Sequence, residues 1–211
     1  MRHTRMLLAV VVLLAGTTAR ADDKDEFFNG KNTDGWEGLS EFWKVEDGAL
    51  IGSSDKNIPF NTFLCSKKEY GDFELSFQVR LKDGKGNSGV QIRSKVHNKE
   101  RLAVTGPQAD IGAGYWGSLY GENFGGMMKE APKDVVTRAL KPDEFNEYSV
   151  KCVGQHVTIK LNGETTVDAD FPKMPEEGII AWQLHGGKAT EVTFRNIQFK
   201  DLSKASGTSP P

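Results

Sequence analysis

The residues best suited to chemistry lie in the stretch 106–121, GPQADIGAGYWGSLYG. Asp110 and Gln108 are two positions apart, so an extended backbone points the carboxylate and the amide to the same side. Three aromatic residues follow at once among glycines, namely Tyr115, Trp116 and Tyr120. A carboxylate can move a proton, an amide can bond a hydroxyl, and a ring can stack on the C–H face of a sugar. The stretch therefore predicts one wall of a sugar site, although a glycine-rich hairpin packed on its own aromatics would have the same composition.

A second polar group comes from the strand expected at residues 178–187. The larger apolar set of this strand, centred on Trp182, belongs in the core, so Gln183 and His185 face the other way. Histidine is the side chain best suited to exchange protons near neutral pH. Asp110 and His185 are therefore the candidate catalytic pair, and a structural histidine beside two glycines is the alternative.

Gln91 and Arg93 alternate with the apolar residues Val90 and Ile92 of another expected strand. In a two-sheet fold such a polar face is either solvated or a binding groove. Arg93 either joins that groove or pairs with an acid on a neighbouring strand, for example Glu74. The candidate substrate-binding residues are Gln91, Arg93, Gln108, Trp116, Tyr120 and Gln183.

The elements that must position these side chains are short strands with a period of two. The clearest is residues 73–81, where five apolar residues alternate with polar ones. The pairs Asp47-Gly48 and Asn162-Gly163 are typical of hairpin turns. Many short strands separated by such turns predict an all-β fold, a sandwich or jelly roll of two antiparallel sheets. We expect its core to contain Trp36, Trp43 and Trp182.

Two segments depart from simple alternation. In the last expected strand, residues 191–200, the apolar phase shifts at Arg195-Asn196, which predicts a β-bulge. Residues 129–140 are the part of the chain that could be helical, but Pro132 lies among them, and we expect a mobile loop there.

Residues 1–21 have the pattern of a secretory signal peptide, in which two arginines and a short apolar run precede the A-x-A site Ala19-Arg20-Ala21. The apolar run is too short to span a bilayer. We therefore expect a protein exported to the periplasm or beyond, without a membrane span. A single domain is expected at residues 22–202 and a disordered tail at residues 203–211.

The net charge bears on the expected binding partners, and the cysteine content bears on a disulfide bond. The formal charge is −2, and without residues 1–21 it becomes −5, from 24 basic and 29 acidic residues, which gives no reason to expect nucleic acid. Cys65 and Cys152 could pair in an oxidising compartment, but both lie on apolar strand faces, where a free thiol also packs well.

No cofactor motif is present. Asp110, Glu122 and His185 could in principle converge on a divalent cation, but their spacing does not resemble a known set of metal ligands. The sequence gives no indication of the oligomeric state.

Six segments in order carry a resemblance to a known family: FNGKNTDGWEG at 28–38, WKVEDGALIG at 43–52, EYGDFELSFQVRL at 69–81, GNSGVQIRS at 86–94, EFNEYSVKCVGQHVTIKLNG at 144–163, and WQLHGG with FRNIQFKDL at 182–202. Together they resemble the 3-keto-disaccharide hydrolase family (DUF1080), which implies a concanavalin A-like (LamG-like) jelly roll. The chain departs from the family pattern at Phe145, where a tryptophan is usual. It also departs at residues 121–125, where similar branches continue with an acidic-basic run.

The resemblance implies cleavage of 3-keto-glycosides. Ordinary glycosidases use two flanking carboxylates, and the E-x-D-x-x-E arrangement of concanavalin-like endoglycanases is absent from the sequence. A ketone at C3 instead allows a base to remove the C2 proton, after which the C1 substituent leaves and water adds. We assign proton transfer to Asp110 and His185 without distinguishing base from acid.

Two other classes fit the same residues. A non-catalytic carbohydrate-binding module would use the same fold, aromatics and amides, and a structural or adhesive exported domain would leave the polar face solvated. Binding without bond cleavage would indicate the first, and no response to any sugar would indicate the second.

Overall fold

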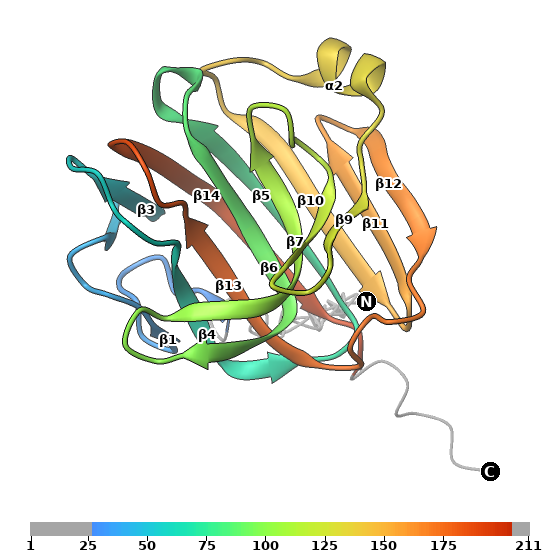
Figure 1. Cartoon of the computed structure of the whole chain (residues 1–211), viewed down its shortest axis with the longest axis horizontal. Coiled ribbons are helices and arrows are strands. Elements are labelled where there is room, and N and C mark those ends of the chain that lie inside the picture. Colours follow the sequence, from blue (N-terminus) through green and yellow to red (C-terminus); the bar gives the residue numbers. More distant parts are fainter. Residues whose placement is uncertain (1–26, 204–211) are drawn as a thin grey trace, which may run out of the picture.

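The computed structural model describes residues 27–203, which form two antiparallel seven-stranded sheets packed face to face (Figure 1). Sheet A has the order β1 (Trp36–Glu37), β4 (Thr62–Tyr70), β13 (Gly178–Leu184), β6 (Asn87–Asn98), β7 (Ala103–Gly112), β8 (Leu119–Glu122) and β9 (Gly126–Lys129). Sheet B has the order β12 (Glu164–Asp170), β11 (His156–Leu161), β10 (Asn146–Val153), β5 (Phe73–Leu81), β14 (Thr190–Asp201), β3 (Ala49–Ser54) and β2 (Trp43–Glu46). The predicted all-β jelly-roll sandwich is confirmed.

The core fills the space between the sheets because each strand turns its apolar set inward. On β5 the apolar residues of the predicted alternation are buried, and the polar residues between them face outward. Trp182 of β13 meets Phe77 of β5 and Phe194 of β14, with ring centroids 5.2 Å and 4.6 Å apart. Trp36 and Trp43 are also buried, as predicted. Burying each such side chain contributes about 1.5–3 kcal/mol.

The turn and bulge predictions are also confirmed. Both residues of Asp47-Gly48 and of Asn162-Gly163 have positive φ, the conformation that a two-residue hairpin turn requires. The pairing of β14 with β5 shifts register between Arg195 and Gln198, with Asn196 at φ 53°, so the apolar phase changes at this bulge.

The expected loop at residues 129–140 is wrong in part, because residues Lys133–Ala139 form the helix α2 at one end of the sandwich (Figure 1). Pro132 lies directly before the first turn, where its missing N–H costs nothing. Val135 and Ala139, four residues apart, are buried on one side of the helix, and Asp134 pairs with Arg138 on the exposed side. Proline thus begins this helix.

Cys65 and Cys152 are buried and unpaired. Cys65 lies in a small apolar cluster on the outer side of sheet A, whereas Cys152 lies between the sheets. Burial raises the pKa of the Cys65 thiol to about 12 and that of Cys152 to about 11, so both stay protonated at neutral pH.

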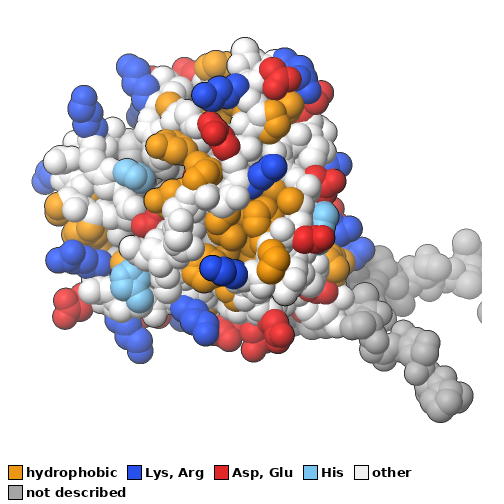
Figure 2. Space-filling model, turned by 45° about the vertical axis from the view of Figure 1, so that its right-hand side comes forward, with side chains coloured by type: hydrophobic (Ala, Val, Ile, Leu, Met, Phe, Trp, Pro, Cys, Tyr) orange, Lys and Arg blue, Asp and Glu red, His pale blue; other side chains and the backbone are white. Residues whose placement is uncertain are grey.

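Residues 1–21 and 204–211, which carry the predicted leader and most of the predicted tail, lie outside the described residues. Within residues 27–203, no helix has the length and apolar character needed to cross a bilayer. Figure 2 shows one face of the molecule, on which acidic and basic side chains are interspersed around a central group of hydrophobic ones.

Candidate functional site

A cavity of about 260 Å³ opens on the side of sheet A that faces away from the core. Its position follows from strand alternation. Ala109 and Ile111 of β7 are buried between the sheets, so Gln108 and Asp110 project outward from the same strand. The nine residues that line the cavity are polar or tyrosine: Asn61, Asn87, Gln108, Asp110, Tyr115, Tyr120, Glu122, Gln183 and His185.

Gly89 makes room for the Gln108 side chain that lines this cavity. It lies on β6, paired with Asp110 of β7, and a Cβ at this position would lie 2.6 Å from Cδ of Gln108. The missing side chain leaves room for the Gln108 amide, whose Nε2 donates to Oδ1 of Asp110 at 2.6 Å and to Oε1 of Gln183 at 3.3 Å. Gln108 therefore links the residues of β7 and β13 across the strand that separates them.

Asp110 provides a buried carboxyl group in the site. Its side chain is only 4 % exposed, and burial raises the pKa of the carboxyl from 3.8 to about 7. The hydrogen bond from Gln108 opposes this rise in pKa, and the charge of Glu122 adds to it. Asp110 therefore exists in both protonation states near neutral pH, as a residue that exchanges protons must.

His185 follows directly after β13, at the end where loops meet the cavity. Its Nδ1 lies 2.5 Å from the carbonyl oxygen of Gly186. A carbonyl can only accept a hydrogen bond, so Nδ1 carries the hydrogen, and in the neutral ring Nε2 has the lone pair. This contact fixes the tautomer in which Nε2 can accept a proton.

Two amides complete the polar lining. Nε2 of Gln183 is buried and has no hydrogen-bond partner in the described residues, whereas its Oε1 accepts from Gln108. A buried donor without a partner is costly, and an oxygen atom of a ligand could accept a hydrogen bond from it. Asn61 donates to Oε1 of Glu122 at 3.2 Å and accepts from the backbone N–H of Gly186 at 2.8 Å.

Five of the residues predicted from the sequence therefore meet in one cavity: Asp110, His185, Gln108, Gln183 and Tyr120. Gln91 lies beneath it, fully buried, and its amide contacts the Gln108 amide at 2.8 Å, so its expected place in the lining is corrected to support of Gln108. Asn61 and Asn87 were missed because they lie outside the alternating segments that the sequence singles out.

The expectation that Trp116 forms the stacking platform is wrong. Trp116 is 7 % exposed and packs in the core between the sheets. The backbone N–H groups of Tyr115 and Trp116 both donate to the carbonyl of Gly112, which closes a tight turn between β7 and β8. In this turn Tyr115 lies at the cavity and is 44 % exposed.

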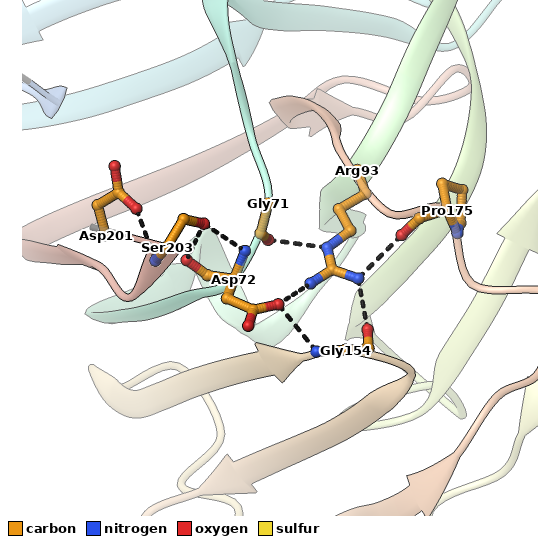
Figure 3. Close-up of polar contacts among 7 residues, drawn as sticks. All are labelled: Gly71, Asp72, Arg93, Gly154, Pro175, Asp201 and Ser203. Atoms are coloured by element: carbon orange, nitrogen blue, oxygen red, sulfur yellow. Dashed lines mark hydrogen bonds and ion pairs between the residues drawn. The ribbon is translucent and has the colours of Figure 1, made fainter. Parts of the chain in front are cut away.

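The expectation that Arg93 joins the binding face is also wrong (Figure 3). Arg93 has φ 46° at a register shift of β6, and this bulge breaks the alternation that would place its side chain beside Gln91. The guanidinium is 1 % exposed and lies among four acceptors, as Figure 3 shows. They are the carbonyls of Gly71 at 2.8 Å, Gly154 at 2.5 Å and Pro175 at 2.9 Å, and Oδ1 of Asp72 at 2.8 Å. The alternative given above, an ion pair with an acid, is therefore the one observed, with Asp72 as the partner in place of Glu74, the example named there.

Metal binding receives no support from the geometry. Asp110, Glu122 and His185 line the same cavity, but nowhere in residues 27–203 do three His, Cys, Asp or Glu side chains gather closely enough to hold a metal ion.

Residues 23–200 match the family described as the 3-keto-alpha-glucoside-1,2-lyase-like domain. The chain belongs to this family. No curated protein sequence matches the chain. Among solved structures, two candidate glycosyl hydrolases from Parabacteroides distasonis are similar. The first has a TM-score of 0.62 and 22 % identity over 83 % of this chain and 92 % of its own. The second has a TM-score of 0.61 and 24 % identity over 82 % and 96 %.

The carbohydrate-binding module CBM66 from Bacillus subtilis is also similar, with a TM-score of 0.59 and 20 % identity over 79 % of this chain and 95 % of its own. At these identities the three structures establish the fold. The family and these neighbours together place the chain among carbohydrate-active, glycosyl hydrolase-like or carbohydrate-binding domains.

Proposed function

We propose that this protein is an exported enzyme that cleaves 3-keto-glycosides by removing the C2 proton, eliminating the C1 substituent and adding water. The observation that carries the proposal is the cavity that brings together Asp110, His185 and the amide N–H of Gln183, which has no hydrogen-bond partner among residues 27–203. Pockets for drug-sized ligands span roughly 300–1,000 Å³, so a cavity of about 260 Å³ suits one sugar ring. The family description, a 1,2-lyase of 3-keto-glucosides, supports elimination across C1 and C2.

The chemistry follows from the ketone. A base takes the proton from C2, and the C–H electrons form an enolate whose negative charge lies on the C3 oxygen. The enolate then re-forms the ketone while the C1–O bond breaks, which leaves a C1–C2 double bond. The departing oxygen takes a proton from an acid, and water adds to C1 to complete a net hydrolysis.

The local contacts support the following roles. His185 is the base, because the hydrogen on Nδ1 leaves Nε2 as the acceptor. Asp110 is the acid, because a pKa of about 7 keeps much of it protonated at neutral pH. Nε2 of Gln183 donates to the enolate oxygen, where a fixed donor stabilises developing charge.

The test uses synthetic 3-keto-glucosides deuterated at C2. Wild type should release the alcohol and give a product that has lost the deuterium at C2. Direct hydrolysis at C1 would instead leave the deuterium in place, apart from the exchange measured in a control without enzyme. Asp110→Asn and His185→Ala should each lower kcat by about 10²–10⁴-fold, the usual range for general acid–base groups.

Matched controls come from the exposed pair on sheet B. His156 contacts Asp168 at 2.9 Å and Asp170 at 2.7 Å, far from the cavity lining. His156→Ala and Asp168→Asn should therefore leave turnover unchanged. Wild-type turnover in Asp110→Asn and His185→Ala together would disprove the assigned site.

The second candidate function is a non-catalytic carbohydrate-binding module. It is favoured by the fold shared with CBM66 and by Tyr115, an exposed ring at a polar cavity. Saturable binding of native or 3-keto sugars by the wild type, with no alcohol released, would establish this candidate in place of the enzyme.

Export is proposed from residues 1–21 alone. N-terminal sequencing of the protein from the periplasm or medium of an expressing cell should read from Asp22. Retention of the intact N-terminus in the cytoplasm would contradict it.

A further inference from the structure

Asn61 joins two segments that carry polar residues of the cavity. It directly precedes β4, whereas His185 directly follows β13 and Glu122 ends β8. Oδ1 of Asn61 accepts from the backbone N–H of Gly186 at 2.8 Å, and its Nδ2 donates to Oε1 of Glu122 at 3.2 Å. One side chain thus connects the loop after β13 with the end of β8, which lie 125 and 61 residues away in the sequence.

The direction of the Asn61 amide is determined by its two partners. A backbone N–H can only donate, so it requires the oxygen of the amide, and an ionised carboxylate can only accept, so it requires the NH₂ group. With the amide reversed, two donors would meet at Gly186 and two acceptors would meet at Glu122. The carboxylate of Glu122 therefore selects the orientation in which Asn61 holds Gly186.

Gly186 is held through the peptide groups on both of its sides. The preceding peptide donates its N–H to Asn61, and the following peptide donates the N–H of Gly187 to the carbonyl of Ile58 at 2.7 Å. This following peptide also contains the carbonyl of Gly186, which accepts from Nδ1 of His185. The position of the carbonyl that fixes the histidine tautomer is therefore set from both sides.

The two segments also approach each other closely at Gly186. A Cβ on Gly186 would lie 2.8 Å from the backbone carbonyl of Phe60, the residue directly before Asn61. Only glycine fits this approach without a shift of the backbone. The hydrogen bond from Gly186 to Asn61 is thus part of a close contact between two backbones, which leaves the loop after β13 little freedom to move.

We infer that Asn61 is a positioning residue for His185. Together with Glu122 it fixes the peptide groups of Gly186, whose carbonyl keeps the hydrogen on Nδ1 of the histidine and leaves Nε2 to take a proton. The role of Nε2 as a base rests on the proposed function. The tautomer is a property of the protein without substrate, so it is measured independently of any activity.

Nitrogen-15 NMR of the histidine side chains measures the tautomer, because ring nitrogens with and without hydrogen differ in chemical shift. On the alkaline side of its titration, His185 of wild type should be in the Nδ1–H form, and its signals are assigned by their absence in His185→Ala. Asn61→Ala should let the ring populate both tautomers, because the Gly186 carbonyl is no longer fixed. A wild-type ring with its hydrogen on Nε2, or an unchanged Nδ1–H form in Asn61→Ala, would overturn the inference.

An exchange of donor and acceptor tests the contact itself and keeps the test valid if Asn61→Ala fails to fold. Asn61→Asp retains an acceptor for Gly186 but sets two carboxylates against each other, so the tautomer should be lost. Adding Glu122→Gln supplies a donor to the introduced carboxylate and restores both hydrogen bonds. The double variant should therefore regain the wild-type tautomer. An unchanged tautomer in Asn61→Asp, or a double variant that does not regain it, would overturn the inference.

Turnover of a 3-keto-glucoside gives the second readout. Asn61→Ala should lower kcat by about 10–10²-fold, because the base is displaced from its productive position, and should change KM by no more than about twofold. Asn98 is the matched control, since its Oδ1 also accepts from a backbone N–H, that of Arg101 at 3.0 Å, away from the cavity lining. Asn98→Ala should change neither the tautomer of His185 nor kcat.

The two readouts separate failure of this inference from failure of the proposed function. If wild type turns over no 3-keto-glycoside, the proposed function fails, and the tautomer of His185 in wild type and the Asn61 variants still decides the inference. If wild type is active and Asn61→Ala retains both the tautomer and kcat, the inference fails and the proposed function stands.

Discussion

Gly89 and Gln108 lie on neighbouring strands, and the Gln108 amide occupies the space that a side chain on Gly89 would need. A Cβ on Gly89 would be 2.6 Å from Cδ and 2.7 Å from Nε2 of Gln108. The same Nε2 holds Oδ1 of Asp110 at 2.6 Å. The smallest residue of β6 therefore determines the position of the carboxylate on β7.

This contact predicts that Gly89→Ala damages activity more than stability. The new methyl group must displace the Gln108 amide and with it Asp110, and a misplacement of about 1 Å can lower kcat/KM by about 10²-fold. Kinetics with a 3-keto-glucoside measure the effect. Gly71→Ala is the control, because its Cβ would meet Oγ of Ser203 at 3.0 Å, away from the cavity. Equal activity of the two variants would contradict the prediction.

The raised pKa of Asp110 predicts a pH-dependent loss of stability. Below pH 3.8 the Asp110 carboxyl is protonated in both the folded and the unfolded protein. Between pH 3.8 and about 7 it ionises only in the unfolded chain, so the free energy of unfolding falls as pH rises. Above about pH 7 it is ionised in both, and this loss of stability is complete. A difference of about three pKa units between the folded and the unfolded protein corresponds to a loss of about 4 kcal/mol in the free energy of unfolding.

Denaturant unfolding of wild type and Asp110→Asn between pH 4.5 and 8 measures this loss, because the other carboxyl groups contribute equally to both proteins. The stability of wild type relative to Asp110→Asn should fall as pH rises through this range. Parallel curves would show that Asp110 ionises as readily in the folded protein as in the unfolded chain.

The role of Asp110 as the acid predicts the direction of the pH–rate profile. Since the protonated form is the active one, kcat should fall as pH rises through about 7, the pKa of the carboxyl. The residual rate of Asp110→Asn should not show this fall, whereas His156→Ala should retain it. A wild-type rate that instead rises through pH 7 would make Asp110 the base.

The alternation of apolar residues was sufficient to predict both sheets and the face on which Gln108, Asp110 and Gln183 lie, because these residues occupy regular strands. It failed where the backbone leaves the extended conformation. At Arg93 a positive φ of 46° in a bulge reverses the direction of the side chain. In the turn after β7, neighbouring residues do not alternate, so Tyr115 lies at the cavity while Trp116, expected there as well, is buried between the sheets.

Asn61 and Glu122 show a different limit of prediction from the sequence. Each is bonded or adjacent to residues far away in the sequence, since Asn61 contacts Gly186 and Glu122. Such contacts depend on how the loops of sheet A meet, which a local pattern does not encode. The contact between Asn61 and Glu122 was therefore visible only in the structure.

Substitution of Arg93 should lower stability more than activity, the reverse of the effect expected for Gly89→Ala. Arg93→Ala would leave the Asp72 carboxylate and three carbonyls without their shared donor, which should cost about 3–5 kcal/mol. Because the guanidinium does not reach the cavity, kcat/KM of the folded protein should stay within about twofold of wild type. Denaturant unfolding and kinetics well below Tm check both parts, with Arg195→Ala as a surface control. A large loss of turnover with unchanged stability would return Arg93 to the binding site.

Tyr115 and Trp116 are neighbours whose substitution should have opposite effects. Trp116→Ala would leave a cavity in the core and should cost about 3–5 kcal/mol. Tyr115→Ala removes a side chain that is 44 % exposed and should change stability by no more than about 0.5 kcal/mol. Because the tyrosine ring lies at the cavity, its loss should raise KM for a 3-keto-glucoside by about tenfold, the factor that corresponds to ~1.4 kcal/mol. Tyr115→Phe keeps the ring and should keep most of the affinity. If Tyr115→Ala bound substrate like wild type, the aromatic part of this sugar site would have to be Tyr120 alone.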